Sequence, residues 1–288
     1  MSELLDEFTL IDRPEKNEPL GPLFWICLGW LALNIFGAIF ANLLPLPDPN
    51  FGNYSAINAA PGFHHLLGTD DLGRDIFSRI VFGSRVSLAV GAGAMVIGFG
   101  IGAPLGMLAA YRRGRFDAVL TTFMYVLLAF PAIIATIAVL SFWTPRALLK
   151  IIIVIGFASV PVVYRVIRTA TMNIATKDYV VAARIQGATD RRILFKELLP
   201  NVAPIGVSFL LIGIATVVIL EGALAFLGLS VNPPTPSWGN MINESRTVMA
   251  QNPWLVIFPS LAMCLLLLCL NFIGDRLRSH FDVTEVKL

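Results

Sequence analysis

Residues that commonly perform catalysis are few in this chain. Its three cysteines, Cys27, Cys264 and Cys269, lie inside apolar stretches and supply neither a disulfide framework nor zinc-ligand spacing. Its three histidines, His64, His65 and His280, are badly spaced for zinc, and the pair at 64–65 in a loop is more often incidental than metal-binding. The sequence has no phosphate-binding G-x-x-x-x-G-K-[ST], no H-E-x-x-H and no G-x-S-x-G. It therefore predicts no catalytic residue, no metal site and no cofactor held by this chain.

One acidic residue lies well inside an apolar stretch, and that is Glu221. A charge at the centre of a bilayer costs roughly 2.5–3.5 kcal/mol, so such residues usually face a cavity or a partner. Glu221 lies near one end of its stretch, and we expect it to pair with an arginine outside, such as Arg74 or Arg246. With Arg74 and Asp75 it is our candidate for a structural ion pair; an outer gate that senses solute is the alternative.

Small residues recur at helical spacing in a second apolar stretch. Gly98, Gly102 and Gly106 are four residues apart, a spacing that lets two membrane helices approach closely. Plain helix packing explains the pattern, and a sliding surface is the functional alternative. Four prolines fall inside apolar stretches and can kink helices there: Pro104, Pro131, Pro161 and Pro259.

The elements that must position these residues are membrane helices. The 288 residues are 56% hydrophobic and 14% charged, whereas soluble domains carry about 25% charged residues. Six stretches are long enough to cross a bilayer, which takes about 20 apolar residues; they are 22–44, 86–110, 118–142, 149–167, 202–227 and 254–274. None shows the alternation of a barrel strand. We expect an all-α integral membrane protein, and the net charge of +2 gives no indication of nucleic-acid binding.

The distribution of lysine and arginine predicts the orientation. With a cytoplasmic N-terminus, fifteen of the 21 lysines and arginines fall inside, and six fall outside: Arg74, Arg79, Arg85, Arg146, Lys150 and Arg246. We therefore expect a cytoplasmic tail at 1–21, an uncleaved membrane anchor at 22–44, an extracytoplasmic segment at 45–85 and a cytoplasmic tail at 275–288. Residues 86–274 form the core of five helices, with a cytoplasmic loop at 168–201.

That cytoplasmic loop is far longer than a helix hairpin requires. In KDYVVAARIQGATDRRILFKELLPN, residues 177–201, Asp178 is a good N-cap for a helix over 179–186, and Gly187 can end it with a positive φ. Asp190 can cap a second helix that Pro200 stops. That helix would place an apolar set on one face: Leu194, Phe195, Leu198 and Leu199. By composition alone, a helix pair resting on the membrane surface is an equally good interpretation.

The order of residues in this loop resembles the "EAA" loop of bacterial ABC importer permeases. Ala182-Ala183 is followed by Gly187, then by Ile193 and by Leu199-Pro200; Val181 stands where the family's glutamate often lies. In that family the first loop helix fits a cleft on an ATP-binding subunit. The resemblance implies that the following residues dock on the ATPase: Asp178, Tyr179, Ala182, Ala183, Arg184, Gly187, Ala188, Leu199 and Pro200.

Further motifs resemble the dipeptide/oligopeptide/nickel branch of these permeases, in its "C" subunit. They are GTDDLGRD at 68–75, EGALAFLGLSVNPPTPSWGNMI at 221–242, NPWLVIFPSLA at 252–262 and NFIGDRLR at 271–278. We expect Gly68, Thr69 and Asp70 to form a turn and cap, and a helix over 71–85. The resemblance covers about residues 64–278.

The family resemblance implies a type I importer permease fold with six transmembrane helices and a coupling-helix loop, in a bacterial inner membrane. It implies uptake of peptides, or alternatively of nickel or another small solute. The implied partners are a second homologous permease, two ATPase subunits that bind ATP and Mg, an extracytoplasmic solute-binding protein and membrane lipids.

Two other function classes are weaker. An ion-gradient transporter predicts ionisable residues near the midplane of several spans and an internal repeat, and only Glu221 hints at this. A purely structural membrane protein would leave the long cytoplasmic loop without a role.

Overall fold

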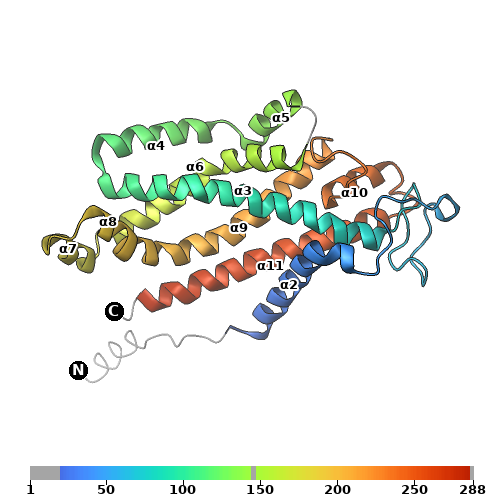
Figure 1. The fold of residues 1–288 in the computed structure, drawn as a ribbon, viewed down its shortest axis with the longest axis horizontal. Helices are drawn as coiled ribbons and strands as arrows, with labels where there is room; N and C mark the ends of the chain where they lie inside the picture. The colour runs from blue at the N-terminus through green and yellow to red at the C-terminus, as the bar shows by residue number, and fades with distance from the viewer. Residues whose placement is uncertain (1–19, 144–146, 286–288) are drawn as a thin grey trace, which may run out of the picture.

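The computed structural model describes residues 20–143 and 147–285, and within these ranges the chain is almost wholly helical (Figure 1). The long helices are α2 (Pro22–Phe40), α3 (Ile76–Arg112), α4 (Gly114–Ala129), α5 (Ala132–Phe142), α6 (Leu148–Ile174), α9 (Leu199–Phe226) and α11 (Trp254–Glu285). Shorter ones are α7 (Asp178–Ile185), α8 (Asp190–Arg192), α10 (Trp238–Glu244), the 3₁₀ turns η1 (Ala41–Leu43), η2 (Tyr54–Ala56) and η4 (Ser245–Thr247), and the π-helical turn η3 (Ile193–Leu198).

Five helical stretches are long and apolar enough to cross a membrane: Pro22–Leu43, Ile76–Arg112, Leu148–Ile174, Asp190–Phe226 and Trp254–Ser279. A sixth crossing exists if α4 and α5 are taken together, which agrees with the six predicted spans. These two helices are bent by 76° against each other. The bend falls at Phe130, which is extended (ψ 127°) because the following Pro131 disfavours a helical residue before it. The third span is therefore broken at Pro131, where the sequence predicted a kink.

The second span begins earlier in the chain than predicted, and it has a different cap. The side chain of Asp75 accepts a hydrogen bond from the Ser78 amide at 2.8 Å, so α3 starts at Ile76 and continues without interruption into the apolar stretch. Asp70 instead accepts bonds from the amides of Leu72 and Arg74 in a tight turn. The expected cap at Asp70 and the expected helical start at 71 are wrong.

The core of the bundle is the contact of α3 with α6, which lie side by side in Figure 1. A Cβ at Gly102 would lie 2.7 Å from the Val160 carbonyl oxygen, and one at Gly106 would lie 2.6 Å from that of Tyr164. A Cβ at Gly98 would lie 3.1 Å from the Ser159 Cβ. The three predicted packing glycines therefore all face α6, and two of them let the backbones of the helices meet.

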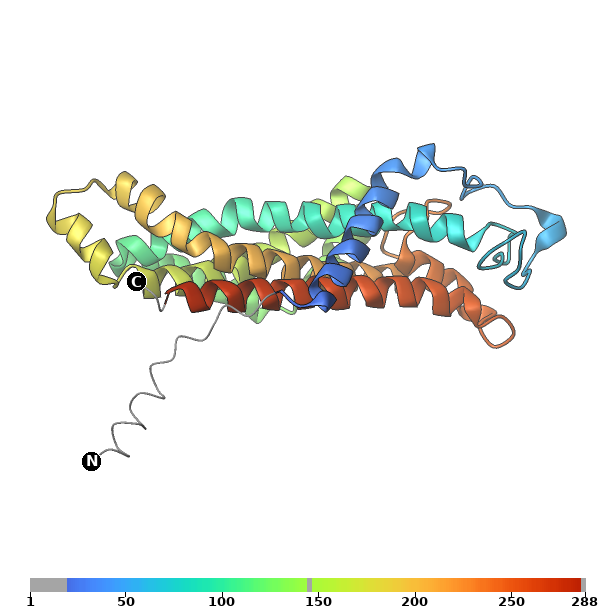
Figure 2. The same cartoon turned by 90° about the horizontal axis from the view of Figure 1, so that it is seen from below.

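The first helix, α2, lies at the edge of the bundle and crosses α11 and α3 obliquely (Figure 2). Within α2 only Phe24, Cys27 and Ala38 are buried. Large apolar side chains such as Trp25 and Ile26 are more than half exposed. The helix is attached along one narrow stripe, and its remaining surface is apolar.

The bundle has two different ends (Figure 1). We call the end that carries α7 and α8, beside the last turns of α11, the loop end. We call the opposite end, with the segment 45–75 and α10, the cap end. Residues that the sequence analysis singled out occur at both.

Candidate functional site

The loop between α6 and α9 begins with α7, an eight-residue helix at the tip of the loop end. Its N-cap position is Lys177, so Asp178 is the first helical residue and not the cap that was predicted. Val180 is fully buried on the side of α7 that faces the rest of the chain. Asp178, Tyr179 and Ala182 are exposed, and Ala183 is half-buried. The helix is therefore anchored by Val180, and its exposed surface is small at Ala182, polar at Asp178 and apolar at Val181 and Ile185.

Gly187 ends α7 as predicted, with φ +81°. Its amide donates to the Arg184 carbonyl at 3.0 Å, and the Ala188 amide donates to the Ala183 carbonyl at 3.1 Å. Among residues 20–143 and 147–285, and apart from the two chain neighbours of Gly187, no atom lies within 4 Å of the place where a Cβ on Gly187 would stand. A larger side chain here would therefore occupy open space outside this chain.

The second arm of the loop differs from the prediction at both of its ends. Thr189 is the N-cap, and its hydroxyl oxygen accepts from the Arg192 amide at 3.4 Å; Asp190 is already helical. Pro200 does not stop the helix, because α8, η3 and α9 form one continuous helix from Asp190 to Phe226. Pro200 lies in the first turn of α9, where a missing amide is tolerated after the wider π turn.

The π turn also changes which apolar residues share a face. Ile193 and Leu198, five residues apart, are both fully buried. Phe195 and Leu199, which were predicted to lie on one apolar face with Leu194 and Leu198, are exposed by 59% and 39%, whereas Leu198 is buried. A five-residue turn cannot be read from α-helical spacing, and this explains the wrong prediction.

Polar contacts fasten the loop to the end of α3. The Tyr111 hydroxyl donates to Asp190 Oδ1 at 2.7 Å. The Arg184 guanidinium lies 5.3 Å from the centre of the Tyr111 ring. Arg184, expected among the docking residues, is thus engaged with its own chain although it remains exposed. Of the other expected docking residues, Gly187, Leu199 and Pro200 are exposed and Ala188 is half-buried.

A second polar cluster at the loop end joins α4 to α6. Arg168 donates to both carboxylate oxygens of Asp117, each at 2.6 Å. The Thr121 hydroxyl lies 2.8 Å from that of Tyr164 and donates to Asp117 at 3.0 Å. Sequence reasoning missed this pair. The signal was an acidic residue at the start of one apolar stretch and an arginine at the end of another.

The cap end holds a buried cluster of charges. Arg74 Nη2 and Arg79 Nη2 both donate to Glu244 Oε2, at 2.8 and 2.9 Å. Arg74 Nε also donates to Asp70 at 2.6 Å. Arg79 is 1% exposed and Arg74 is 4% exposed. The partner of Arg74 is thus Glu244 of α10, a residue that the sequence analysis did not single out, and not Glu221.

Glu221 is buried among serines. It accepts from the Ser230 hydroxyl at 2.5 Å and from the Ser87 hydroxyl at 3.4 Å. Ser230 comes close because the chain reverses after α9 at Gly228, where φ is +71°. The predicted pairing with Arg74 or Arg246 is wrong, because Arg74 bonds to Glu244 and the Arg246 guanidinium lies 5.0 Å from the centre of the Phe226 ring.

Asp75, the third member of the expected ion pair, bonds to His65. Its Oδ1 lies 3.0 Å from His65 Nδ1, while its Oδ2 caps α3. Within the described residues, no three His, Cys, Asp or Glu side chains gather as metal ligands would. His65 therefore contacts the residue that caps α3 and helps to hold the turn before this helix.

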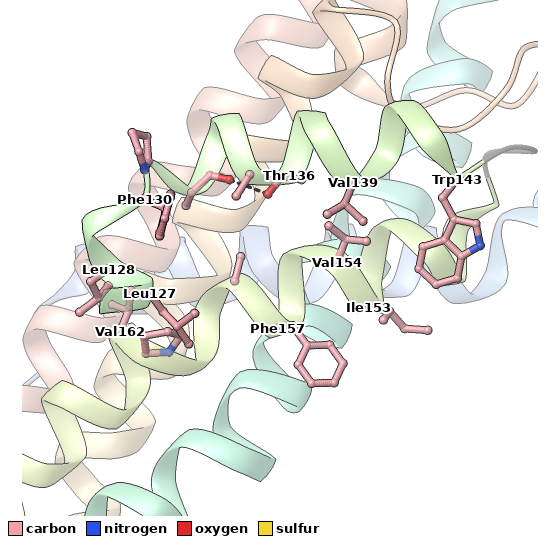
Figure 3. A pocket seen from close by; sticks show the side chains of 15 residues that line it. Leu127, Leu128, Phe130, Thr136, Val139, Trp143, Ile153, Val154, Phe157 and Val162 are labelled. Atoms are coloured by element: carbon pink, nitrogen blue, oxygen red, sulfur yellow. Dashed lines mark hydrogen bonds between the residues drawn. The ribbon is translucent and has the colours of Figure 1, made fainter. Parts of the chain in front are cut away.

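An apolar cavity of about 620 Å³ lies between the α4–α5 bend and α6 (Figure 3). Its wall includes Leu127, Phe130, Val139, Trp143 and Phe157. Thr136 also lines the cavity, and its hydroxyl already donates to the Ala132 carbonyl of the same helix at 2.7 Å. The volume is that of a small-molecule site, but the wall offers no charged group. The sequence showed the kink at Pro131 and gave no sign of the cavity.

Most of the chain matches a known protein family and curated transport proteins. Residues 102–283 match the family "Binding-protein-dependent transport system inner membrane component". The glutathione transport system permease protein GsiD of Pectobacterium atrosepticum is 39% identical over 240 residues, which are 83% of this chain and 79% of that protein. The dipeptide transport system permease protein DppC of Alkalihalophilus pseudofirmus is 38% identical over 246 residues, 85% and 80% of the two chains.

A solved structure shows the same fold. A chain of the MetNI methionine ABC transporter, in an inward-facing conformation, aligns with a TM-score of 0.60 and 22% identity. The alignment covers 70% of the present chain and 96% of that chain. At this identity the likeness concerns the fold alone.

Proposed function

The chain belongs to the family of binding-protein-dependent transport system inner membrane components, and from this premise we propose that it carries peptides across the bacterial inner membrane. Members of the family are permease subunits of ABC importers, which are not enzymes because a separate subunit hydrolyses ATP. The chain is thus the multi-pass membrane subunit of such an importer. The proposal concerns its solute, its partners, its orientation and the role of each site residue.

The observation that carries the proposal is the geometry of α7. A helix that is anchored by the buried Val180 and exposes Ala182 beside the apolar Val181 and Ile185 offers a surface that a cleft on a partner can cover. Open space around Gly187 leaves room for a partner surface. We assign this cleft to an ATPase subunit, two of which bind ATP and Mg.

The continuous helix from Asp190 to Phe226 supports a direct mechanical link. When ATP binding closes the ATPase subunits, α7 and α8 move with them, and the fifth span moves as the extension of α8. The spans then change from an inward-open to an outward-open arrangement. An extracytoplasmic solute-binding protein releases its solute into the open path, and hydrolysis resets the complex.

A second, homologous permease subunit completes the path. The cavity beside the α4–α5 bend is walled by apolar side chains, and a charged peptide needs polar groups along its route. A route between two subunits supplies such groups from both chains. The apolar outer surface of α2 lies against lipid or against this second subunit.

The charges support the orientation that we propose. We place the loop end in the cytoplasm, because it carries most of the 21 lysines and arginines. The tails at 1–21 and 275–288 are then cytoplasmic, the segment at 45–85 is extracytoplasmic, residues 22–44 are a membrane anchor, and residues 86–274 form the permease core with its coupling loop at 168–201.

The two relatives are named for glutathione and dipeptide transport, and both solutes are short peptides. A peptide is therefore the solute class that we assign to this chain, with nickel or another small solute as the alternative. In binding-protein-dependent systems the choice of solute rests largely with a different polypeptide, so the ligand of the co-purifying binding protein identifies it.

The docking assignment is tested at Gly187 and Ala183. We expect Gly187→Trp and Ala183→Glu to abolish uptake and solute-stimulated ATP hydrolysis by the complete transporter in vesicles, with membrane insertion unchanged. Gly187→Ala is the matched control, because it carries the same strain of a positive φ without the bulk. Wild-type uptake by the bulky variants, or equal loss in Gly187→Ala, contradicts docking at this surface.

A further inference from the structure

Tyr111 occupies a special place at the loop end. It is the penultimate residue of α3, and it contacts both arms of the loop that joins α6 to α9. We propose that Tyr111 is the positioning residue that fastens this loop to α3, so that a movement of the loop becomes a movement of the second span. The inference rests on the proposed function, because it concerns what happens after the loop is moved by a partner.

The first step of the argument is the nature of the contacts. Val180, Ile193 and Leu198 hold the loop by apolar burial, which has no preferred direction. The Tyr111 contacts are directional. Its hydroxyl meets a carboxylate oxygen at 2.7 Å, a charge-assisted hydrogen bond, and its ring face meets a guanidinium at 5.3 Å.

The second step is that these contacts come from opposite sides of the Gly187 turn. Arg184 belongs to α7, and Asp190 is the first residue of α8. One side chain of α3 therefore contacts both arms. When a partner displaces the arms together, Tyr111 is displaced with them; when the arms separate, one of the two contacts is lost.

The third step is that α3 extends to the cap end. Its 37 residues form one helix of about 55 Å. Pro104 removes a backbone bond within it, but Gly102 and Gly106 on either side rest on the α6 backbone and support that turn. At the cap end, Arg79 of the same helix is bonded to Glu244 of α10 at 2.9 Å. A displacement of Tyr111 is thus carried to α10.

The experiment uses the complete transporter in vesicles with its loaded binding protein. Tyr111→Phe keeps the ring and removes the hydroxyl, and Asp190→Ala removes the acceptor. We expect each to lower solute-stimulated ATP hydrolysis and uptake about fivefold, with basal ATP hydrolysis and the amount of assembled complex unchanged. Asp190→Asn keeps an acceptor oxygen for the Tyr111 hydroxyl and should stay within about twofold of wild type.

A double variant separates this link from a general weakening. Because Tyr111→Phe and Asp190→Ala break the same bond, the double variant should lose no more than either single one. Tyr125→Phe, which removes the hydroxyl of a half-exposed tyrosine on the neighbouring α4, is the control and should behave as wild type.

Several results would overturn the inference: wild-type rates in Tyr111→Phe, equal losses in Asp190→Asn and Asp190→Ala, or losses that multiply in the double variant. Losses that merely follow a smaller amount of assembled complex would also overturn it, because Tyr111 would then be structural. Gly187→Trp is measured beside these variants. If Gly187→Trp abolishes uptake while Tyr111→Phe leaves it at the wild-type rate, the docking function is supported and the proposed role of Tyr111 is wrong.

Discussion

The two ends of the molecule use the same residue type in opposite ways. At the cap end, Arg74 and Arg79 are buried and share Glu244 as an acceptor. On the second arm of the loop, at the other end, Arg191 and Arg192 are exposed. Buried cations require partners at fixed positions, whereas exposed cations are solvated and can move with little cost. The cap end is therefore built to keep its shape, whereas the second arm of the loop carries charges that can move with little cost.

This difference predicts how much an arginine at each end contributes to the stability of the fold. Removing one of the buried arginines takes away one of the two cations that Glu244 contacts, and this loss lowers the stability of the fold. Removing an exposed arginine changes little in the fold. The same substitution, arginine to alanine, thus measures the character of each end.

The largest effect is expected from Arg79→Ala at the cap end. It removes the bonds from Arg79 to Glu244 and to the Pro49 carbonyl oxygen, so that Glu244 keeps Arg74 as its one remaining cation and a cavity is left where the 1% exposed guanidinium lay. We expect the free energy of unfolding to fall by about 3–5 kcal/mol. The midpoint of thermal unfolding of the solubilised protein measures this loss.

Arg79→Lys is the matched control, since it keeps the charge and loses the planar fork. It should unfold at a temperature between those of wild type and Arg79→Ala. An unchanged midpoint in Arg79→Ala would show that the cap end is not held together by these charges.

An intermediate effect is expected between the two ends, where α3 meets α6. A methyl group at Gly102 would stand 2.7 Å from the Val160 carbonyl oxygen and 3.0 Å from the Tyr164 amide nitrogen. Both atoms belong to the backbone, so the helices must separate. We expect Gly102→Ala to lower the free energy of unfolding by about 1–3 kcal/mol, again measured by thermal unfolding.

Gly100 of the same helix provides the control, because nothing lies within 4 Å of its Cβ position. Gly100→Ala should be neutral or slightly stabilising, since alanine favours a helix more than glycine does. Equal losses in Gly100→Ala and Gly102→Ala would mean that the close contact of α3 with α6 is not the cause.

The smallest effect is expected from Arg191→Ala at the loop end. The side chain is exposed on the second arm of the loop, and surface substitutions usually change the free energy of unfolding by less than about 0.5 kcal/mol. Thermal unfolding of this variant, measured beside Arg79→Ala, tests the comparison directly. A loss as large as that of Arg79→Ala would remove the distinction between the two ends.

The apolar stretches allowed most of the fold to be predicted. The length of the hydrophobic stretches alone locates the spans. The four-residue spacing of Gly98, Gly102 and Gly106 predicted a packing face, and this face lies against α6. The positive φ of Gly187 was also foreseen, because a helix followed by glycine commonly ends that way.

The errors have a common physical cause, because each concerned a choice that the tertiary structure makes. Pro200 can stop a helix or begin one, and the preceding π turn decides between these outcomes. Glu221 could have paired with an arginine, but the reversal at Gly228 brings Ser230 to it first. Glu244 is more than 160 residues from Arg79 in sequence, and no local pattern connects the two.

The contact of Glu221 with Ser87 has a mechanical consequence for the two longest helical stretches, Ile76–Arg112 and Asp190–Phe226. Near one end, Ser87 of the first stretch bonds to Glu221 of the second; at the other end, Tyr111 bonds to Asp190. Translation of one helix along the other by a single turn, about 5.4 Å, would break both bonds at once. Tilting of the two as a pair breaks neither. The pair therefore resists shear, and a rocking motion is the change of shape that leaves both bonds intact.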